Sequence, residues 1–595
     1  MRKNKFLACL CVTLSVTAMS VLASCGGGKE EGGDNTPSQE VQKVAVTSVV
    51  LNFTEIDIEK GGTQKLIASV FPTNADNKKV TWKSLNEDIA TVDQNGLITA
   101  KNPGTAAIQV VTEDGNKKAA CTVTVNEPLP EATETVTITF RECFGQLIKD
   151  NLNAQISDFQ RRVQREERVK VNVVLNDSSN YQSLESDILA DFSTGVYPNL
   201  TVAYPDHVAN YMEEEAKKGS SFIVKLDDLA KDQTIGFGRE EWLGDDTKYT
   251  NYADIIPSYL EEGQQFTREG TYVLPFMKST EAMYYNVKLV QKAFAKYKPE
   301  INNVQKITQY MKNITWDDFM ELCKTIVDNK DDYGKNFTSS AFYDSDSNMF
   351  ITGLFQKGIS YSYIKEGHGY IGFSEGEDRT KAETFIEQLK GYHDYGKNKG
   401  VSALTTKAAD GTYGSNSFKE EKTVFSIGST GGAGYNMTTD FQIGVCKVPT
   451  FGDNHVYVSQ GPSLAIMKDP KKSDAENEKL TKYTWKLLKY LTNKEVNTQL
   501  CLDGSEGYLP VRESAYGTKK FLSWQATGGY LVDTANVTLE DIDNHFLSTA
   551  CFKGSSELRK QVGSAIGTYF VGNSKELSSA KDVVDYIVSQ TSLKM

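Results

Sequence analysis

The chain has 595 residues, 39% of them hydrophobic, and a formal net charge of −13. A chain of this length exceeds what one ordinary core holds, so we expect several domains. The acidic balance and the lack of basic clusters in the sequence argue against nucleic acid as a partner.

The first residues have the pattern of an exported lipoprotein. A basic start precedes a short apolar run from Phe6 to about Met19, which is too short for a membrane span and typical of a removed signal peptide. The stretch Leu22-Ala23-Ser24-Cys25 with three following glycines resembles a bacterial lipobox. That resemblance implies a signal peptide over 1–24, a diacylglycerol on Cys25 and a lipid-anchored position on the extracytoplasmic side of the cell membrane. The alternative is an uncleaved apolar anchor.

Residues 25–43 contain little that could be buried, so we predict a flexible tether. Six cysteines lie beyond the lipid site, none at metal-ligand spacing and most in apolar stretches. We interpret them as small core residues rather than a disulfide framework, although an exported protein permits a pair. We expect no metal and no cofactor. These six are Cys121, Cys143, Cys323, Cys446, Cys501 and Cys551.

Residues 44–126 show short alternating runs that predict an all-β sandwich. Cys121, Val123 and Val125 alternate with threonines, the period-two pattern of a half-buried strand. Asn95-Gly96 is a hairpin turn signal. The runs around Trp82, 89–93 and 96–106 resemble the bacterial immunoglobulin-like group 2 repeat, in which Trp82 would be a core residue. A spacer and an adhesin are both open as its role.

A Pro- and Glu-rich linker over 127–135 separates this domain from the rest. After it, strand patterns at 135–140 and 169–176 alternate with helical patterns at 3.6-residue spacing. Such alternation predicts α/β units on largely parallel sheets.

Five motifs follow in an order and spacing that resemble the extracellular solute-binding protein family 1, the receptor component of ABC importers. The resemblance covers 136–595. It implies a two-lobed α/β fold of the periplasmic-binding-protein type II class with a cleft between the lobes. It also implies capture of a small solute (a sugar, an oligosaccharide or glycerol phosphate) for an ABC permease, and we expect a monomer. The motifs are Gly195-Val-Tyr-Pro-Asn199, Tyr284-Tyr-Asn286, Thr315-Trp-Asp-Asp-Phe319, Phe425-Ser-Ile-Gly-Ser429 and Gly507-Tyr-Leu-Pro-Val511.

Two of these motifs are interpreted as scaffold. Tyr285 alternates with polar neighbours as a packed strand residue, and Asn286 is placed to cap the following helix. Thr315 and Asp318 start another helix in the manner of a capping box, ahead of an apolar stripe that runs to Val327.

Sugars offer flat C–H faces and many hydroxyl groups, so a sugar site needs aromatic rings beside polar side chains in a cleft that can close. The family resemblance places such contacts at strand ends and turns, where the alternative for each is an ordinary solvated loop. These candidates are Tyr204, Asp206, Lys278, Ser279, Thr280, Ser429, Thr430, Gln460 and Gly461.

Tyr508 and Arg559 raise a sharper alternative. Their surroundings resemble the glycerol-3-phosphate-binding branch of the family, whose corresponding tyrosine and arginine grip the polar head of the ligand. An arginine fork suits phosphate. Against this, Leu558 and Val562 belong to a core stripe, which would leave Arg559 on an exposed flank.

The sequence contains neither a zinc-protease HExxH motif nor a GxSxG nucleophile elbow. The segment 391–398 nearly matches a phosphate-binding loop but ends in Asn398, and 344–348 opens like a calcium loop without its turn glycine. We interpret both as polar segments and predict no catalytic residue. A glycosidase with two unrecognised carboxylates and an adhesive surface protein remain the alternative classes.

Overall fold

The computed structural model describes residues 43–72, 75–407, 411–451, 454–505, 507–542 and 546–592. Cys25, the predicted signal peptide and nearly all of the predicted tether therefore lie outside the described residues. The chain divides into two compact units, one built mainly from the residues before Thr124 and the other from Thr124 to the C-terminus. Each unit is described by itself.

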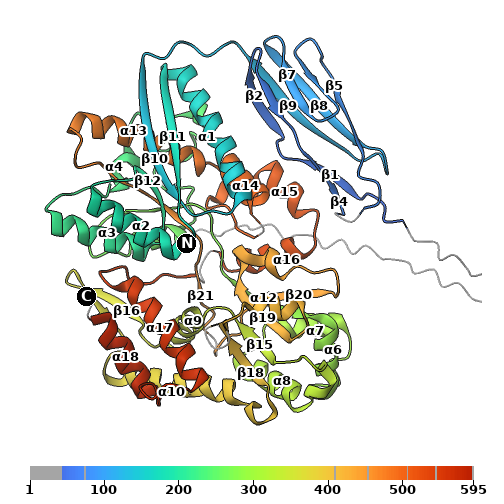
Figure 1. Cartoon of the computed structure of the whole chain (residues 1–595), viewed down its shortest axis with the longest axis vertical. Coiled ribbons are helices and arrows are strands. Elements are labelled where there is room, and N and C mark those ends of the chain that lie inside the picture. The colour runs from blue at the N-terminus through green and yellow to red at the C-terminus, as the bar shows by residue number, and fades with distance from the viewer. Residues whose placement is uncertain are drawn as a thin grey trace, which may run out of the picture. The chain divides into compact units, whose positions relative to one another are not determined.

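The first unit is a sandwich of short strands (blue in Figure 1), of which the pairs β1-β4, β3-β7, β5-β8 and β6-β7 are antiparallel. Its larger sheet has the order β2-β9-β8-β5 and its smaller sheets are β3-β7-β6 and β1-β4. Trp82, Cys121 and Val123 are buried as predicted. The strands are β1 (Ser48–Leu51), β2 (Glu55–Glu59), β3 (Thr63–Lys65), β4 (Ala68–Phe71), β5 (Val80–Ser84), β6 (Ala90–Val92), β7 (Leu97–Ala100), β8 (Gly104–Thr112) and β9 (Lys118–Asn126).

The predicted hairpin turn lies between β6 and β7. Gly96 has a φ of +81°, and a Cβ there would lie 2.5 Å from the carbonyl oxygen of Leu66. Glycine is therefore required both by the backbone conformation and by the close approach of a neighbouring strand.

The second unit has two lobes, each built around a five-stranded sheet (Figure 1). The first-lobe sheet has the order β11-β10-β12-β22-β13. Its strands are β10 (Glu134–Glu142), β11 (Val169–Asp177), β12 (Leu200–Ala203), β13 (Leu274–Pro275) and β22 (Ser463–Ile466). Its helices are α1 (Gln146–Glu167), α2 (Tyr181–Thr194), α3 (Pro205–Lys218), α4 (Leu226–Lys231), α5 (Pro257–Glu262), α13 (Asp474–Leu491), α14 (Lys494–Gly504) and α15 (Lys519–Gln525).

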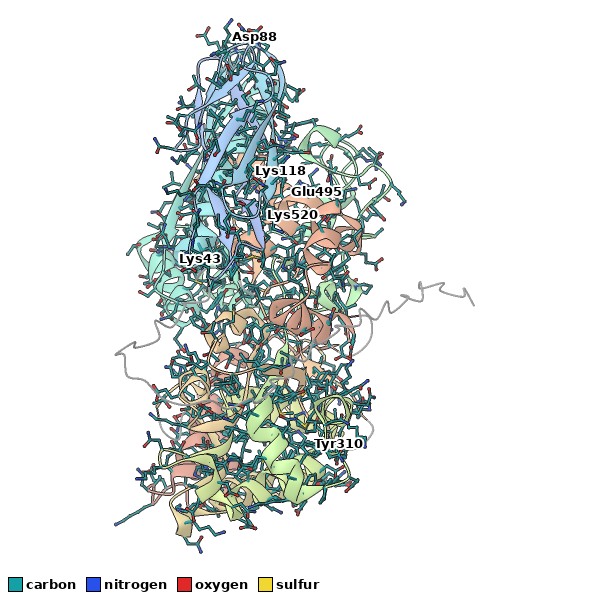
Figure 2. All side chains as sticks on the ribbon, turned by 90° about the vertical axis from the view of Figure 1, so that its right-hand side faces the viewer. Lys43, Asp88, Lys118, Tyr310, Glu495 and Lys520 are labelled. Carbon is teal, nitrogen blue, oxygen red and sulfur yellow. The ribbon has the colours of Figure 1, made fainter. Side chains whose placement is uncertain are left out.

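The second-lobe sheet has the order β18-β15-β19-β14-β20. Its strands are β14 (Glu281–Asn286), β15 (Ser339–Tyr343), β18 (Ser402–Thr406), β19 (Thr423–Ser429) and β20 (Ile443–Lys447), and two smaller pairs are β16 (Ser362–Lys365) with β17 (His368–Ile371) and β21 (Tyr457–Val458) with β23 (Phe546–Leu547). Its helices are α6 (Val287–Tyr297), α7 (Val304–Met311), α8 (Trp316–Asp328), α9 (Asp346–Gln356), α10 (Gly376–Asp394), α12 (Gly414–Lys419), α16 (Tyr530–Leu539), α17 (Ser555–Val571) and α18 (Ala580–Ser592). Figure 2 shows Glu495 and Lys520 on the first lobe and Tyr310 on the second.

Both scaffold predictions are confirmed in the second lobe. Tyr285 is buried at 1% exposure, and the Asn286 side chain accepts a hydrogen bond from the backbone N–H of Leu289 at the start of α6. The hydroxyl group of Thr315 accepts from the N–H of Asp318 and so caps α8. Trp316 stacks on Tyr343 behind that cap.

The prediction of largely parallel sheets is correct except for one strand in each lobe. In the first lobe β22 runs against β12 and β13, and in the second β14 runs against β19 and β20. Both reversed strands directly follow a crossing of the chain between the lobes. A chain that leaves one sheet at the carboxyl edge and enters the facing sheet at its carboxyl edge has to run antiparallel there. The carboxyl ends of the parallel strands therefore face the space between the lobes, where open α/β sheets bind ligands.

The crossing segments bond to one another. Ser279 and Gln460 exchange both backbone hydrogen bonds, at 3.0 and 2.9 Å, and Lys278 does the same with Leu509. The first crossing, Lys278–Thr280, thus pairs with the second crossing, Val458–Gly461, and with the segment that follows α14. These paired segments determine where polar side chains can enter the space between the lobes.

The six cysteines within the described residues are free thiols, and five of them are buried. This agrees with their interpretation as small core residues. Among the described residues no helix has the length and apolar character that a bilayer span requires.

Candidate functional site

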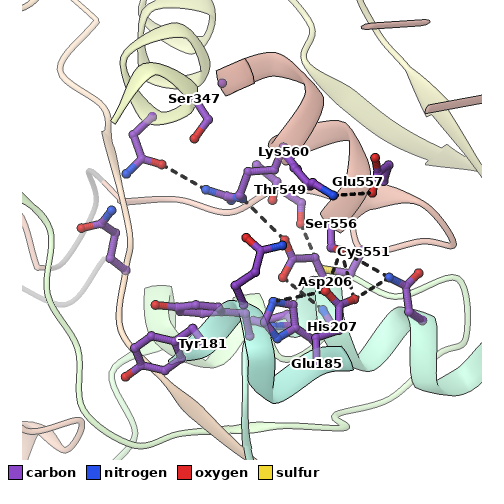
Figure 3. Close-up of a pocket in the computed structure, with 18 of the residues that line it drawn as sticks. Tyr181, Glu185, Asp206, His207, Ser347, Thr549, Cys551, Ser556, Glu557 and Lys560 are labelled. Carbon is purple, nitrogen blue, oxygen red and sulfur yellow. Dashed lines mark hydrogen bonds and ion pairs between the residues drawn. The ribbon is translucent and has the colours of Figure 1, made fainter. Parts of the chain in front are cut away.

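A cavity of about 1210 Å³ lies between the two lobes of the second unit. The first lobe lines it with the first half of α2 and with α3 along its length, and the second lobe with the start of α9 and the first half of α17. The crossing Val458–Gly461 and the segment Leu547–Cys551 complete the lining. Figure 3 shows side chains from both lobes that point into this space. The volume exceeds the roughly 300–1,000 Å³ common for small-molecule sites, so a solute larger than a single sugar ring fits.

Two tyrosines form an aromatic corner on the first lobe. The rings of Tyr181 and Tyr204 lie 4.8 Å apart at 37°, and Tyr204 packs edge-on against His207. Burial raises the pKa of both phenol groups well above the usual value, with a smaller contribution from Tyr508. The hydroxyl groups therefore stay neutral and can donate as well as accept hydrogen bonds.

The lobes touch along one rim of the cavity (Figure 3). On the second lobe, the Ser556 hydroxyl group donates to the Glu185 carboxylate of α2 at 3.0 Å. Asn210 of α3 donates to the same carboxylate at 2.7 Å and accepts from the backbone N–H of Gly554 at 3.2 Å. These bonds join α2 and α3 to the first turn of α17.

One turn further along α17, Arg559 also reaches the opposite lobe. Its Nε lies 3.5 Å from Oδ2 of Asp206, and its Nη1 donates to Oδ1 of Asn348 at 3.1 Å. Burial lowers the pKa of the guanidinium, but the charge of Asp206 and the neighbouring Tyr361 and Tyr204 outweigh burial and raise it overall. The arginine stays charged and is already engaged by protein groups.

Several buried polar atoms of the lining have no hydrogen-bond partner among the described residues. They include His207 Nδ1, Glu262 Oε1, Ser459 Oγ and Gln460 Oε1. Buried polar groups are nearly always paired, because an unpaired one costs the desolvation free energy. These atoms therefore leave hydrogen-bonding capacity inside the cavity.

Of the candidate residues predicted from the sequence, some line the cavity and the rest lie behind it. Arg559 lies in the lining and its side chain contacts Asp206 of the opposite lobe, which argues against the alternative of an exposed flank. The residues in the lining are Tyr204, Asp206, Gln460, Gly461 and Arg559. Those outside it are Lys278, Ser279, Thr280, Ser429, Thr430 and Tyr508.

The residues outside the lining belong to the crossings or form hydrogen bonds with them. The Nζ of Lys278 donates to Glu262 at 2.7 Å, a residue that itself lines the cavity. The Oγ atoms of Ser279 and Ser429 lie 3.3 Å apart, and the Thr280 hydroxyl group donates to the carbonyl of Val458. Their contact with a solute stays a prediction.

Thr430 and Tyr508 also lie behind the cavity lining, next to the crossings. The Thr430 hydroxyl group accepts from the N–H of Thr280, and Tyr508 lies against Gly431 and is hydrogen-bonded to Tyr181 of the cavity wall. Gly461 has a φ of +96°, and a Cβ there would lie 2.2 Å from the carbonyl oxygen of Met277. The first crossing, rather than a ligand, is what requires glycine at this position.

The starts of α2 and α9 line the cavity but are not among the residues predicted from the sequence. Tyr181 and Glu185 come from α2. The polar segment 344–348 includes the start of α9, where the Ser345 side chain caps the helix from Asp346 onward. The signal that could have found both is their position, directly after the parallel strands β11 and β15. Among the residues that the structure describes, no group of His, Cys, Asp and Glu is arranged to hold a metal ion.

The sequence matches two family models. Residues 154–528 match the bacterial extracellular solute-binding protein model, and residues 45–123 match the bacterial Ig-like domain of group 2. The chain belongs to the bacterial extracellular solute-binding protein family. This family consists of substrate-binding proteins and implies an extracytoplasmic location.

Solved structures of solute-binding proteins share the two-lobed fold. The GacH receptor of Streptomyces glaucescens, solved with and without acarbose, has a TM-score of 0.53 and 15% identity over 78% of this chain and 99% of its own. UgpB from Mycobacterium tuberculosis in complex with glycerophosphocholine has a TM-score of 0.53 and 19% identity over 77% and 98%. An ABC substrate-binding protein from Listeria monocytogenes in complex with cycloalternan has a TM-score of 0.54 and 14% identity over 77% and 99%. At such identities the likeness shows the fold alone.

Curated relatives match only a short segment that corresponds to the Ig-like domain. The kappa-carrageenase of Pseudoalteromonas carrageenovora is 39% identical over 100 residues, 16% of this chain. An Ig-like virion protein of Serratia phage KSP90 is 44% identical over 84 residues, 14% of this chain. The matches span only 25% and 33% of these relatives' own lengths.

Proposed function

We propose that this solute-binding protein captures a carbohydrate or a related small polar solute between its lobes and delivers it to an ABC importer. The observation that carries the proposal is the cavity, because it combines an aromatic corner with buried polar atoms that lack partners. Both lobes and a crossing contribute to it, so a bound solute stabilises the closed arrangement by its higher affinity for that arrangement.

The chemistry of the lining supports a sugar-type ligand. Tyr181 and Tyr204 offer ring surface to the C–H face of a sugar, and their neutral hydroxyl groups can bond its edge. His207 Nδ1 on α3 and Gln460 Oε1 on the crossing Val458–Gly461 both lack hydrogen-bond partners among the described residues. A sugar hydroxyl group can donate to one such atom and accept from another donor, which suits a lining of mixed donors and acceptors.

The charge of the lining favours a neutral solute over a phosphate. Arg559, the candidate phosphate ligand, is engaged by Asp206 and Asn348. Lys217 and Lys560 lie within ion-pair distance of Glu214 and Glu557. Acidic side chains outnumber basic ones among the residues of the lining: Glu185, Asp206, Glu213, Glu214, Glu262, Asp344, Asp346 and Glu557 against Lys217, Lys407, Lys553, Arg559 and Lys560.

Glycerol 3-phosphate or a phosphodiester is the second candidate, because the Arg559 side chain points into the cavity and a strong anion could compete with Asp206 for it. Capture of either solute needs no bond to be made or broken, so we propose a binding protein rather than an enzyme. We also propose a lipid anchor at Cys25, a monomeric state, and an Ig-like unit that acts as a spacer.

Mass spectrometry of small molecules released from the purified native protein tests the proposal directly. We expect a sugar or an oligosaccharide in stoichiometric amount, returned chemically unchanged. Titration calorimetry with maltotriose and with glycerol 3-phosphate then separates the two candidates. A released product that differs from the added ligand would identify an enzyme, and the absence of binding to every polar solute would refute the proposed function.

A further inference from the structure

Glu281 is a buried carboxyl group directly behind the cavity. It is the first residue of β14, immediately after the crossing Lys278–Thr280, and is only 3% exposed. One carboxyl oxygen accepts from the Tyr343 hydroxyl group at 2.6 Å, and the other accepts from Nδ2 of Asn348 at 3.1 Å. Glu281 does not belong to the cavity lining, whereas Asn348 does. The hydrogen bond that links Glu281 to the cavity lining is therefore the one from Asn348.

Asn348 stands between two groups of opposite hydrogen-bonding character. An ionised carboxylate can only accept hydrogen bonds and a guanidinium can only donate them. The amide NH₂ group of Asn348 must then face Glu281, and its oxygen must face Arg559. Asn348 Nδ2 lies 3.1 Å from the Glu281 carboxylate, and Asn348 Oδ1 lies 3.1 Å from Nη1 of Arg559. Arg559 in turn lies 3.5 Å from Asp206 of the first lobe.

We propose that Glu281 is a positioning residue for solute capture, which orients Asn348 and through it holds Arg559 against the opposite lobe. The chain of contacts runs from the first crossing, through α9 and α17, to α3. This chain of contacts couples the backbone of the first crossing, where we expect the lobes to hinge, to the ion pair across the cavity. The inference rests on the proposed function, since it assigns Glu281 a part in closure around a solute.

The ionisation of Glu281 sets the strength of this coupling. Burial raises its pKa to about 7, although hydrogen bonds from Tyr343 and Asn348 oppose the rise. The charged groups that face it are Asp344, which raises the pKa further, and Arg559, which lowers it. Above neutral pH the carboxylate accepts from Asn348 and attracts Arg559. Below neutral pH one oxygen carries a proton, and Asn348 loses the partner that fixes its orientation.

The first test measures affinity as a function of pH by titration calorimetry, with maltotriose as the probe and the full chain as the protein. We expect wild type to bind roughly threefold to tenfold more tightly at pH 8.5 than at pH 5.5, the worth of one hydrogen bond of ordinary net strength. Glu281→Gln should lose that increase and behave at every pH as wild type does at pH 5.5. His207 is present in both proteins, so the comparison isolates Glu281. Equal pH profiles for the two proteins would overturn the inference.

Glu142→Gln is the matched control. Glu142 is also buried, burial raises its pKa to about 7, and it accepts from the backbone N–H of Phe144 at the end of β10. None of its contacts leads to Asn348 or Arg559. We expect its variant to keep the wild-type pH profile of affinity.

The second test needs no solute. It compares thermal midpoints at pH 8 in two double-mutant cycles. The first cycle combines Glu281→Gln with Asp206→Asn, and the second combines Glu142→Gln with Asp206→Asn. Effects of distant, unconnected sites add, whereas those of coupled sites do not. We expect the first pair to be non-additive and the second pair to be additive. Additive shifts in both pairs would overturn the inference. Failure of maltotriose to bind would count against the proposed function, whereas the first cycle would still decide whether Glu281 is coupled to Asp206.

Discussion

Removal of the Ser556 hydroxyl group should weaken the closed arrangement of the lobes. This group donates to both oxygens of Glu185, at 3.0 and 3.2 Å, and accepts from Asn210 at 3.3 Å. Ser556 belongs to α17 of the second lobe, while its partners belong to α2 and α3 of the first. Ser556→Ala therefore deletes contacts between the lobes and little within either one.

The expected size follows from the kind of bond that is lost. A hydrogen bond to a charged group contributes about 1.5–3 kcal/mol, and water at the cavity rim can replace part of it, so about 1–2 kcal/mol is expected. That free energy shifts the equilibrium between closed and open forms by roughly fivefold to thirtyfold. The apparent affinity for a solute falls by at most the same factor, because affinity scales with the fraction of protein that can close.

Titration calorimetry with the solute identified by mass spectrometry measures the loss, and small-angle scattering of the ligand-free protein should show a larger radius of gyration for the variant. Ser178→Ala is the control, because the Ser178 hydroxyl group donates to Asp187 at 2.6 Å within the first lobe and lies outside the cavity lining. If Ser556→Ala binds as tightly as wild type and scatters identically, these contacts do not hold the lobes together.

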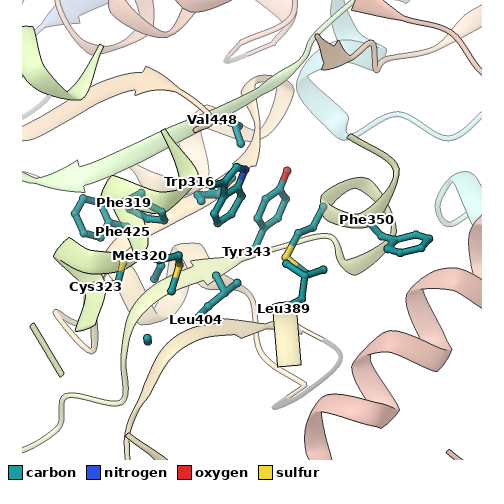
Figure 4. Packing of buried hydrophobic residues seen from close by; sticks show 14 of the residues in the cluster. Trp316, Phe319, Met320, Cys323, Tyr343, Phe350, Leu389, Leu404, Phe425 and Val448 are labelled. Carbon is teal, nitrogen blue, oxygen red and sulfur yellow. The ribbon is translucent and has the colours of Figure 1, made fainter. Parts of the chain in front are cut away.

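Other variants test the remaining proposals. Cys25→Ser should move the protein from the membrane fraction to the soluble fraction, and unchanged membrane retention would contradict a lipid anchor. Deletion of residues 1–130 should leave the calorimetric affinity unchanged if the Ig-like unit is a spacer. Arg559→Ala should abolish binding of a phosphate ligand but reduce binding of a neutral sugar only modestly, as titration with both would reveal. Phe319→Ala removes a ring from the packed core of the second lobe (Figure 4) and should cost about 3–5 kcal/mol, visible as a lower thermal midpoint.

The sequence predicted the elements of the fold well where local physics decides them. The period-two pattern at Cys121 and the 3.6-residue stripe after Thr315 each state which face is buried, and the structure confirms both. Caps such as Asn286 are equally local, because the side chain bonds to a backbone group three residues away. Such features depend on neighbours in sequence, so they can be inferred from a short stretch of chain.

The candidate site was predicted less completely, because its contacts join distant parts of the chain. Asp206 and Arg559 were both named from the resemblance to a family, but their mutual pairing was not, since they lie on helices of different lobes. Lys278 was named as a ligand contact, whereas the structure bonds its ammonium group to Glu262. A polar residue in a turn looks the same in sequence whether it meets solvent, a solute or the other lobe.

One general rule would have recovered much of what was missed. The carboxyl ends of parallel strands collect at one edge of each sheet, and here the two edges face each other. Tyr181 follows β11, Asn348 follows β15 and Lys407 follows β18, and all three line the cavity. Because β14 and β22 come from crossings, they start at that edge instead of ending there, which places Glu281 behind the cavity. The direction of a strand thus decides whether its first or its last residues lie near the solute, and that direction follows from where the chain crosses between the lobes.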